Sequence, residues 1–120
     1  MSIHPALREV TADDVAAALR KHAILLVDVR EPAEYAAERI HGALLFPLST
    51  FDPAALPVDP GRPVVFHCGS GKRSAVAVGR CLEAGVSAFT HMKGGMIAWK
   101  AAGHTTVSLN PATGAVQDRR

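Results

Sequence analysis

Apolar runs of strand length that alternate with helix-like segments constrain the fold of this chain more than any other feature. Residues 23–29, AILLVDV, form a continuous apolar run, which is typical of a strand buried on both faces of a sheet. Similar runs occupy residues 42–48 and 63–68, and weaker strand candidates lie at residues 8–10 and 88–94. This alternation predicts an α/β domain with a mostly parallel central sheet of about five strands and helices on both faces.

The segments between these runs have helical features. Thr11 can cap a helix over residues 11–22, and acidic residues follow it at the positive N-terminal end. Pro32 stands where the first turn of a helix over residues 30–40 tolerates proline. Two further helices are expected at residues 72–85 and 95–103, and the proline-rich connection at residues 49–62 is expected to contain a short helix.

Length and composition fit a single globular domain. The chain has 120 residues, of which 48% are hydrophobic and 20% are charged, enough for a core without stabilising cross-links. The last residues, from 105 to 120, show little periodicity. We therefore expect one domain over residues 1–104, followed by a C-terminal tail over residues 105–120 that is wrapped against it or partly disordered.

Charge and composition exclude several classes of partner. A net charge of +2 is too small to favour nucleic acid or an acidic membrane surface. The first residues lack the pattern of a secretory signal, and no apolar run approaches the length of a membrane span. The two cysteines, Cys68 and Cys81, do not make a disulfide framework, so we expect a cytoplasmic protein.

The loop that follows residues 63–67 is the strongest candidate for a functional site. It reads HCGSGKRSAV, and Cys68 falls at the carboxyl end of a predicted strand, where the functional crevices of α/β sheets lie. A helix that begins near Lys72 would direct its unpaired N–H groups at the loop, and Lys72 and Arg73 add positive charge. These features favour the thiolate form of Cys68, which is the nucleophilic form.

Small and polar residues in the same loop suit an anion. Gly69 and Gly71 permit a positive φ and let successive N–H groups converge, while Ser70 and Ser74 offer hydroxyl donors. One interpretation is a cradle for an anion beside the Cys68 sulfur. The other is a buried structural cysteine in an ordinary glycine-rich turn, and the loop alone leaves both open.

Three stretches resemble signatures of the rhodanese family. HCGSGKRS is similar to the active-site loop of that family, in which cysteine, four residues and arginine precede serine or threonine. LLVDVREPAEYAAERIHGALLFPL resembles the first signature, and KGGMIAWKAAG resembles the closing one. Together they cover nearly all of residues 8–104. The chain departs from the family at Glu38 and Arg39, before Ile40, where Gly-His is common.

The resemblance implies a rhodanese-like fold over residues 1–104 and the activity of a thiosulfate sulfurtransferase. Cys68 would attack the outer sulfur of a small anionic donor such as thiosulfate, release sulfite and retain a persulfide. Cyanide or a thiol acceptor would then remove that sulfur. The loop N–H groups would stabilise the persulfide, and Lys72 and Arg73 would orient the donor. The residues expected to bind substrate are Gly69, Ser70, Gly71, Lys72, Arg73 and Ser74.

Loop length separates sulfur transfer from a neighbouring chemistry. Phosphatases and arsenate reductases of the same fold have a loop one residue longer, whereas four residues lie between Cys68 and Arg73. A single sulfur atom fits the tighter loop, while phosphate oxygens need a larger ring of donors. Two alternatives of other classes stay open: a persulfide carrier supplied by a partner protein, and a non-catalytic regulatory module.

Several other polar residues are expected to be structural. Cys81 lies too far along its helix to form a disulfide with the loop cysteine, and it shares a face with apolar residues. Asp28 and Arg30 are expected to form a charge network between strand and loop. Glu31 and Glu34 are expected at a helix start or in contact with Arg30.

The histidines do not suggest a metal site. Their spacing, with one another and with the cysteines, is not that of metal ligands, so neither a metal nor a cofactor is expected. His67 precedes Cys68 on the predicted strand, and successive side chains of a strand point to opposite faces. We therefore expect a structural role for His67.

Overall fold

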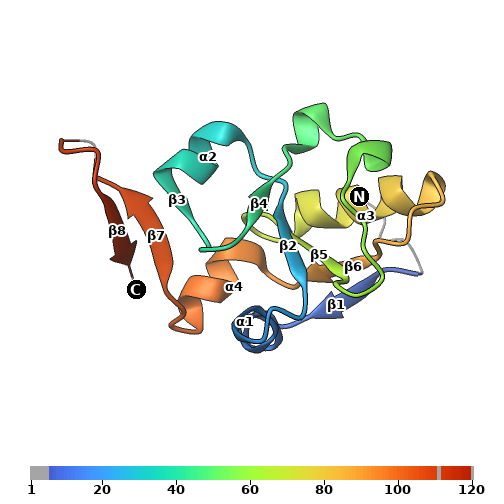
Figure 1. Ribbon diagram of the computed structural model, residues 1–120, viewed down its shortest axis with the longest axis horizontal. Helices are drawn as coiled ribbons and strands as arrows, with labels where there is room; N and C mark the ends of the chain where they lie inside the picture. Colours follow the sequence, from blue (N-terminus) through green and yellow to red (C-terminus); the bar gives the residue numbers. More distant parts are fainter. Residues whose placement is uncertain (1–5, 111, 120) are drawn as a thin grey trace.

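A five-stranded parallel sheet forms the centre of the molecule (Figure 1). The computed structural model describes residues 6–110 and 112–119. The strands follow the order β1, β6, β5, β2, β4, and each neighbouring pair is parallel. Their bounds are β1 Arg8–Val10, β2 Leu25–Asp28, β4 Leu44–Leu45, β5 Val64–His67 and β6 Thr90–Met92. The predicted α/β architecture is therefore confirmed.

Helices connect these strands as the sequence predicts. Their bounds are α1 Ala12–Arg20, α2 Pro32–Ala37, α3 Lys72–Glu83 and α4 Gly95–Ala101. The Thr11 hydroxyl caps α1 by accepting the N–H of Asp14 at 3.1 Å. The proline-rich connection holds two 3-10 turns, η1 Leu48–Thr50 and η2 Pro53–Ala55, in place of one short helix, because proline lacks the N–H that a helix needs. Within the described ranges, no helix is both long and apolar enough to cross a membrane.

The helices cover both faces of the sheet. Leu26 of β2 packs in a hydrophobic cluster with α1 and α4, whereas the next residue, Val27, packs in a second cluster with α3. Val65 and Phe66 of β5 divide between the two clusters in the same way. Because both faces are buried, these strands are continuously apolar rather than alternating.

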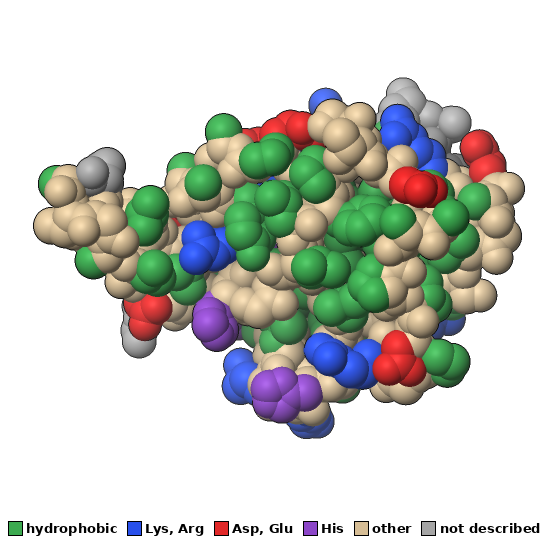
Figure 2. Space-filling view, turned by 45° about the horizontal axis from the view of Figure 1, so that its top comes forward, with side chains coloured by type: hydrophobic (Ala, Val, Ile, Leu, Met, Phe, Trp, Pro, Cys, Tyr) green, Lys and Arg blue, Asp and Glu red, His purple; other side chains and the backbone are tan. Residues whose placement is uncertain are grey.

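A second, antiparallel sheet lies at one end of the molecule (Figure 1), which is the narrow end of the space-filling view (Figure 2). It pairs β3 Glu38–Arg39 with β7 Thr106–Leu109, and β7 with β8 Val116–Arg119. The weak periodicity after residue 104 predicts no regular element there, but backbone pairing with β3 supplies one. The same pairing ends α2 at Ala37, earlier than expected, because the next two residues are extended. The division of the chain into a domain and a tail at residue 104 stays a prediction.

Candidate active site

The loop after β5 is held from two sides. Cys68 follows β5 in a fully buried position, with 0% of its surface exposed, and α3 begins at Lys72. On the other side, the first turn of α4 contacts the loop. The N–H of Met96 donates to the Cys68 carbonyl oxygen at 2.8 Å, and the N–H of Ile97 donates to that of Gly69 at 3.1 Å. These contacts fix the backbone that carries the cysteine.

Two glycines allow this close approach. Gly71 has a φ of 100° immediately before α3, in the left-handed region that favours glycine. Gly95 has a φ of 56°, and a β-carbon there would lie 2.3 Å from the carbonyl oxygen of Cys68. The Gly-Gly pair of the closing signature therefore lets α4 approach the cysteine loop.

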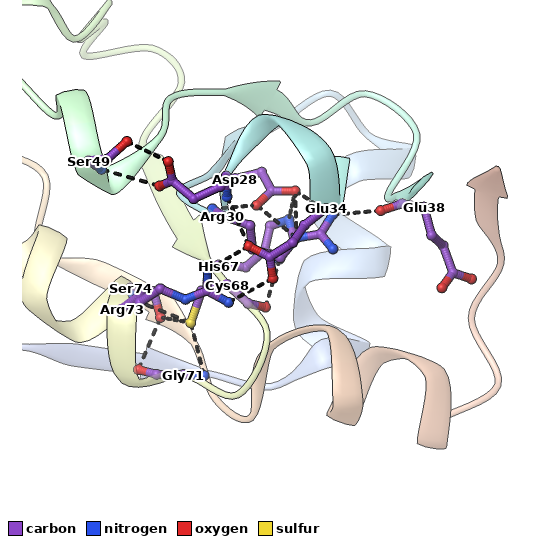
Figure 3. A network of polar contacts seen from close by, with 11 residues as sticks. Asp28, Arg30, Glu34, Glu38, Ser49, His67, Cys68, Gly71, Arg73 and Ser74 are labelled. Atoms are coloured by element: carbon purple, nitrogen blue, oxygen red, sulfur yellow. Dashed lines mark hydrogen bonds and ion pairs between the residues drawn. The ribbon is translucent and has the colours of Figure 1, made fainter. Parts of the chain in front are cut away.

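The Cys68 sulfur faces hydrogen-bond donors from its own loop and helix (Figure 3). The backbone nitrogens of Gly71 and Ser74 donate to Sγ at 3.1 and 3.4 Å, and the Cys68 thiol in turn donates to the Ser74 hydroxyl oxygen at 3.6 Å. Burial by itself raises the pKa of the Cys68 thiol, but hydrogen bonds from Ser74, Gly71 and Ser70 outweigh burial and lower that pKa below its ordinary value. The site therefore favours the thiolate.

The two cations of the loop have different surroundings. Lys72 is exposed to solvent. The Arg73 guanidinium donates to both carboxylate oxygens of Glu34, at 2.7 and 3.0 Å, and this pairing lowers the pKa of Glu34 to about 2. Glu34 also accepts the N–H of Glu31 at 3.0 Å, as expected of a residue at the start of α2. Its ion-pair partner is thus Arg73 rather than Arg30, because the loop and α2 meet at this edge of the sheet.

A buried charge network supports the strand ends next to the loop (Figure 3). Arg30 donates to Asp28 from Nε at 3.1 Å and from Nη2 at 2.8 Å, and Nη2 also donates to the carbonyl oxygen of Glu38 at 2.7 Å. His67 is fully buried beside it, with Nε2 at 3.4 Å from Asp28 Oδ2. Burial lowers the pKa of His67, so the ring is neutral. These contacts match the structural roles expected of Asp28, Arg30 and His67.

His91 and Glu9, which were not expected at the site from the sequence, are linked to Ser74 by hydrogen bonds. The Ser74 hydroxyl oxygen is 2.7 Å from Nδ1 of His91, and Nε2 of the same ring is 2.9 Å from a carboxylate oxygen of Glu9. On the sheet, His91 of β6 lies in register between Glu9 of β1 and Phe66 of β5. The sequence shows that His91 lies in a predicted strand. It does not show which residues lie beside His91, because these depend on the order of the strands in the sheet.

Cys81 is chemically different from Cys68. It is buried in α3, and burial raises the pKa of its thiol to about 11. A thiol with such a pKa is scarcely ionised at neutral pH and is a poor nucleophile. As for metals, the described part of the chain contains no group of three His, Cys, Asp or Glu side chains that could hold an ion.

Fold and site together define an α/β domain built around a cysteine whose thiolate is stabilised by its own loop. The chain belongs to the rhodanese-like family, since the family model of the Rhodanese-like domain matches residues 11–102. The resemblance of the three signatures is thereby confirmed. The matched residues include the cysteine loop, the helix α2 that carries Glu34, the ion-pair partner of Arg73, and the Gly-Gly pair at the start of α4.

Several curated proteins are similar to this chain. It is 42% identical over 93 residues to the protein slr1261 of Synechocystis sp., which covers 78% of this chain and 52% of that protein. It is 37% identical over 76 residues to a protein of Allochromatium vinosum named Sulfurtransferase, covering 63% and 71% of the two chains. It is 40% identical over 80 residues to a Mycobacterium tuberculosis protein named Probable adenylyltransferase/sulfurtransferase MoeZ, covering 63% and 20%. The chain thus spans about half of slr1261 and a fifth of the MoeZ protein.

Solved structures share the fold. The Thiosulfate sulfurtransferase from Pseudomonas aeruginosa aligns with a TM-score of 0.74 and 26% identity, over 83% of this chain and 20% of that one. A rhodanese-like domain protein from Staphylococcus aureus aligns with a TM-score of 0.68 and 30% identity, over 78% and 91%. Because the second alignment covers nearly all of its partner, the likeness extends over a whole domain.

Proposed function

We propose that this chain transfers sulfane sulfur through a persulfide on Cys68, and that thiosulfate or a similar anion is the donor. The observation that carries the proposal is the pair of N–H groups, from Gly71 and Ser74, that face the Cys68 sulfur at 3.1 and 3.4 Å. Membership of the rhodanese-like family and the likeness to a protein named Sulfurtransferase support sulfur transfer as the general activity. The choice of thiosulfate rests on the cationic loop.

The first half-reaction follows from a preformed thiolate. The Cys68 thiolate attacks the outer sulfur of thiosulfate, a bond forms between the two sulfurs, and the bond between the outer sulfur and the sulfite group breaks. Sulfite leaves as a dianion with the electron pair of the broken bond, and the new terminal sulfur keeps the negative charge that the outer sulfur of thiosulfate carried. Donors that are already oriented stabilise this charge without rearrangement. In the second half-reaction, cyanide or a thiolate attacks the terminal sulfur and releases the Cys68 thiolate.

The loop residues would divide the work of holding the anion. Backbone N–H groups from Ser70 to Ser74 would surround the terminal sulfur, and the absence of side chains at Gly69 and Gly71 would leave room for the donor. Lys72 and Arg73 would supply positive charge. In this scheme neither a metal nor a cofactor takes part, because the electron pairs come from the sulfur atoms and the acceptor.

Intact mass tests the proposal directly. Reduced protein incubated with thiosulfate should gain the mass of one sulfur atom, and cyanide should remove it. The gain should be stoichiometric, because one thiolate carries the persulfide. No gain of mass, from a protein that remains folded and reduced, would contradict thiosulfate as the donor.

A persulfide carrier supplied by a partner protein is the second candidate. Its support is the match to one fifth of the MoeZ protein, whose printed name joins a sulfurtransferase to an adenylyltransferase. A carrier would gain sulfur faster from a protein persulfide than from thiosulfate. Parallel mass measurements with a protein that carries a cysteine persulfide and with thiosulfate would separate the two candidates.

Removing the Lys72 charge should weaken the use of an anionic donor. Arg73 is paired with Glu34, whereas Lys72 is exposed to solvent, so we expect the Lys72 ammonium to attract thiosulfate. We expect Lys72→Ala to lower kcat/KM for thiosulfate about threefold to tenfold, mainly through KM, and to change it less for an uncharged dialkyl trisulfide. Steady-state kinetics with both donors would measure the difference.

Lys21→Ala is the matched control for Lys72→Ala. It removes the same charge at the C-terminal end of α1, away from the loop, where screening by salt suppresses its effect on the donor. Equal losses for the charged and uncharged donors in Lys72→Ala would show that the residue acts through loop structure instead of charge.

A further inference from the structure

The Ser74 hydroxyl connects the cysteine to a buried histidine and a carboxylate. The distances are 3.6 Å from Cys68 Sγ to Ser74 Oγ, 2.7 Å from Ser74 Oγ to His91 Nδ1, and 2.9 Å from His91 Nε2 to Glu9 Oε2. Cys68 follows β5, and Ser74 lies in the first turn of α3. His91 lies on β6 and Glu9 on β1. Since the sheet order is β1, β6, β5, the line of contacts crosses three neighbouring strands.

The donor and acceptor roles in this line follow from its carboxylate end. An ionised Glu9 carboxylate can only accept, so Nε2 of His91 carries the hydrogen between them. In the neutral ring Nδ1 is then an acceptor, and the Ser74 hydroxyl donates to it. That leaves the Ser74 oxygen free to accept from the Cys68 thiol. Every hydrogen in the line therefore points from the sulfur towards the carboxylate.

We propose that His91 is the internal proton acceptor for Cys68 and acts through the Ser74 hydroxyl. The S–H bond of Cys68 breaks and its proton forms a new O–H bond on Ser74. The original O–H bond of Ser74 breaks, and that proton forms an N–H bond on His91 Nδ1. The electron pair stays on the sulfur, so the products are a thiolate and an imidazolium, with no change in net charge. The proposal rests on the proposed function only in taking Cys68 as the nucleophile.

The product arrangement satisfies each of its charged groups. The Ser74 hydroxyl now donates to the thiolate, and the imidazolium donates from Nδ1 to Ser74 and from Nε2 to Glu9. A buried imidazolium is costly when unpaired, and His91 is only 3% exposed, so the Glu9 carboxylate is what makes it tolerable. A second acceptor for the Ser74 hydroxyl, the carbonyl oxygen of Gly71, lies further away, at 3.2 Å.

The groups that face His91 come from three elements. Glu9 on β1 is a charged side chain in contact with it, Ser74 on α3 leads to the titratable Cys68, and Gly71 before α3 is close enough that a β-carbon there would lie 3.8 Å from Cε1 of the ring. Protonation of the ring is therefore coupled to one carboxylate and one thiol. Acid that protonates the ring from solvent would remove the acceptor and return Cys68 to the thiol.

A pH titration of thiolate absorbance tests the proposal without a sulfur donor. Subtracting the titration of Cys68→Ser isolates the Cys68 thiolate, and Cys81, with a pKa of about 11, contributes little below that range. In His91→Asn, the amide oxygen can accept the Ser74 hydrogen but cannot take up a proton. We expect this variant to move the Cys68 titration upward by about one pH unit, which is about tenfold less thiolate at acidic pH.

Two carboxamide variants provide a matched pair. Glu9→Gln removes the negative charge that stabilises the imidazolium. It should move the midpoint of the Cys68 titration to higher pH, by less than His91→Asn does. Asp13→Asn removes a similar exposed carboxylate, which contacts His104 at 2.7 Å, and should leave the titration unchanged. An upward shift of the same size in both carboxamide variants would mean a general charge effect and would overturn the proposal.

A double variant separates action through Ser74 from a general structural role. Ser74→Ala should move the midpoint of the Cys68 titration to higher pH. Adding His91→Asn to Ser74→Ala should cause no further shift, because the contact between Cys68 and His91 through the Ser74 hydroxyl is already broken. An equal further shift, or an unshifted titration in His91→Asn alone, would overturn the proposal. Alkylation of the buried Cys81 would show that His91→Asn has lost its fold. In that case the titration of Glu9→Gln tests the proposal instead. Failure here would leave persulfide formation untouched, and the mass measurement with thiosulfate would show this.

Discussion

Cys68→Ser is expected to reduce sulfur transfer to the uncatalysed background, a loss of at least roughly a thousandfold. The serine hydroxyl is not ionised near neutral pH, and it cannot hold a persulfide. Its backbone would keep the hydrogen bond from Met96 to the carbonyl oxygen of residue 68, at 2.8 Å in the native protein, so the loop should remain folded. Intact mass after incubation with thiosulfate should show no added sulfur in this variant.

Cys81→Ser is the control for the loss of a thiol. It places a hydroxyl in the apolar cluster under α3, which costs about 1–3 kcal/mol of unfolding free energy if the hydroxyl finds no partner. Transfer by the folded protein should stay near normal, because the pKa of Cys81 is raised to about 11 and its thiol does not compete. Equal losses in the two variants would contradict the assignment of Cys68 as the nucleophile.

Parts of the site that lie close together in the chain could be predicted from the sequence. Cys68 and its donors Gly71 and Ser74 belong to one loop and the first turn of one helix, so their hydrogen bonds depend on local geometry. The capping of α1 by Thr11 is local in the same sense. The parallel sheet was also predictable, because buried strands are continuously apolar whatever their order.

Contacts between distant segments could not be predicted in this way. Glu9 and His91 are 82 residues apart, and Arg73 and Glu34 are 39 apart. The first pair meets because β1 lies beside β6, and the second because α2 reaches the cysteine loop. An alternation of strands and helices predicts a sheet without fixing which strands are neighbours. The pairing of β7 with β3 was unpredictable for the same reason.

Gly95→Ala is expected to cause a large loss of stability together with a loss of thiolate. The new β-carbon would lie 2.3 Å from the carbonyl oxygen of Cys68 and 2.7 Å from the carbonyl carbon of Gly69, and both are backbone atoms that cannot rotate away. Either α4 or the loop must move, and the hydrogen bond from Met96 to Cys68 would lengthen. We expect a loss of about 3 kcal/mol or more in unfolding free energy, measured by denaturant titration.

Gly103→Ala separates this clash from ordinary backbone strain. Gly103 also has a positive φ, 83° against 56° at Gly95, but a β-carbon there meets nothing within 4 Å, so its replacement should cost only about 1 kcal/mol. It should also leave the midpoint of the Cys68 thiolate titration unchanged, whereas Gly95→Ala should move that midpoint to higher pH. Similar losses in the two variants, with an unmoved titration in both, would mean that α4 does not hold the cysteine loop. The thiolate would then depend on Ser70, Gly71 and Ser74 without support from α4, and the Gly-Gly pair would serve the start of α4.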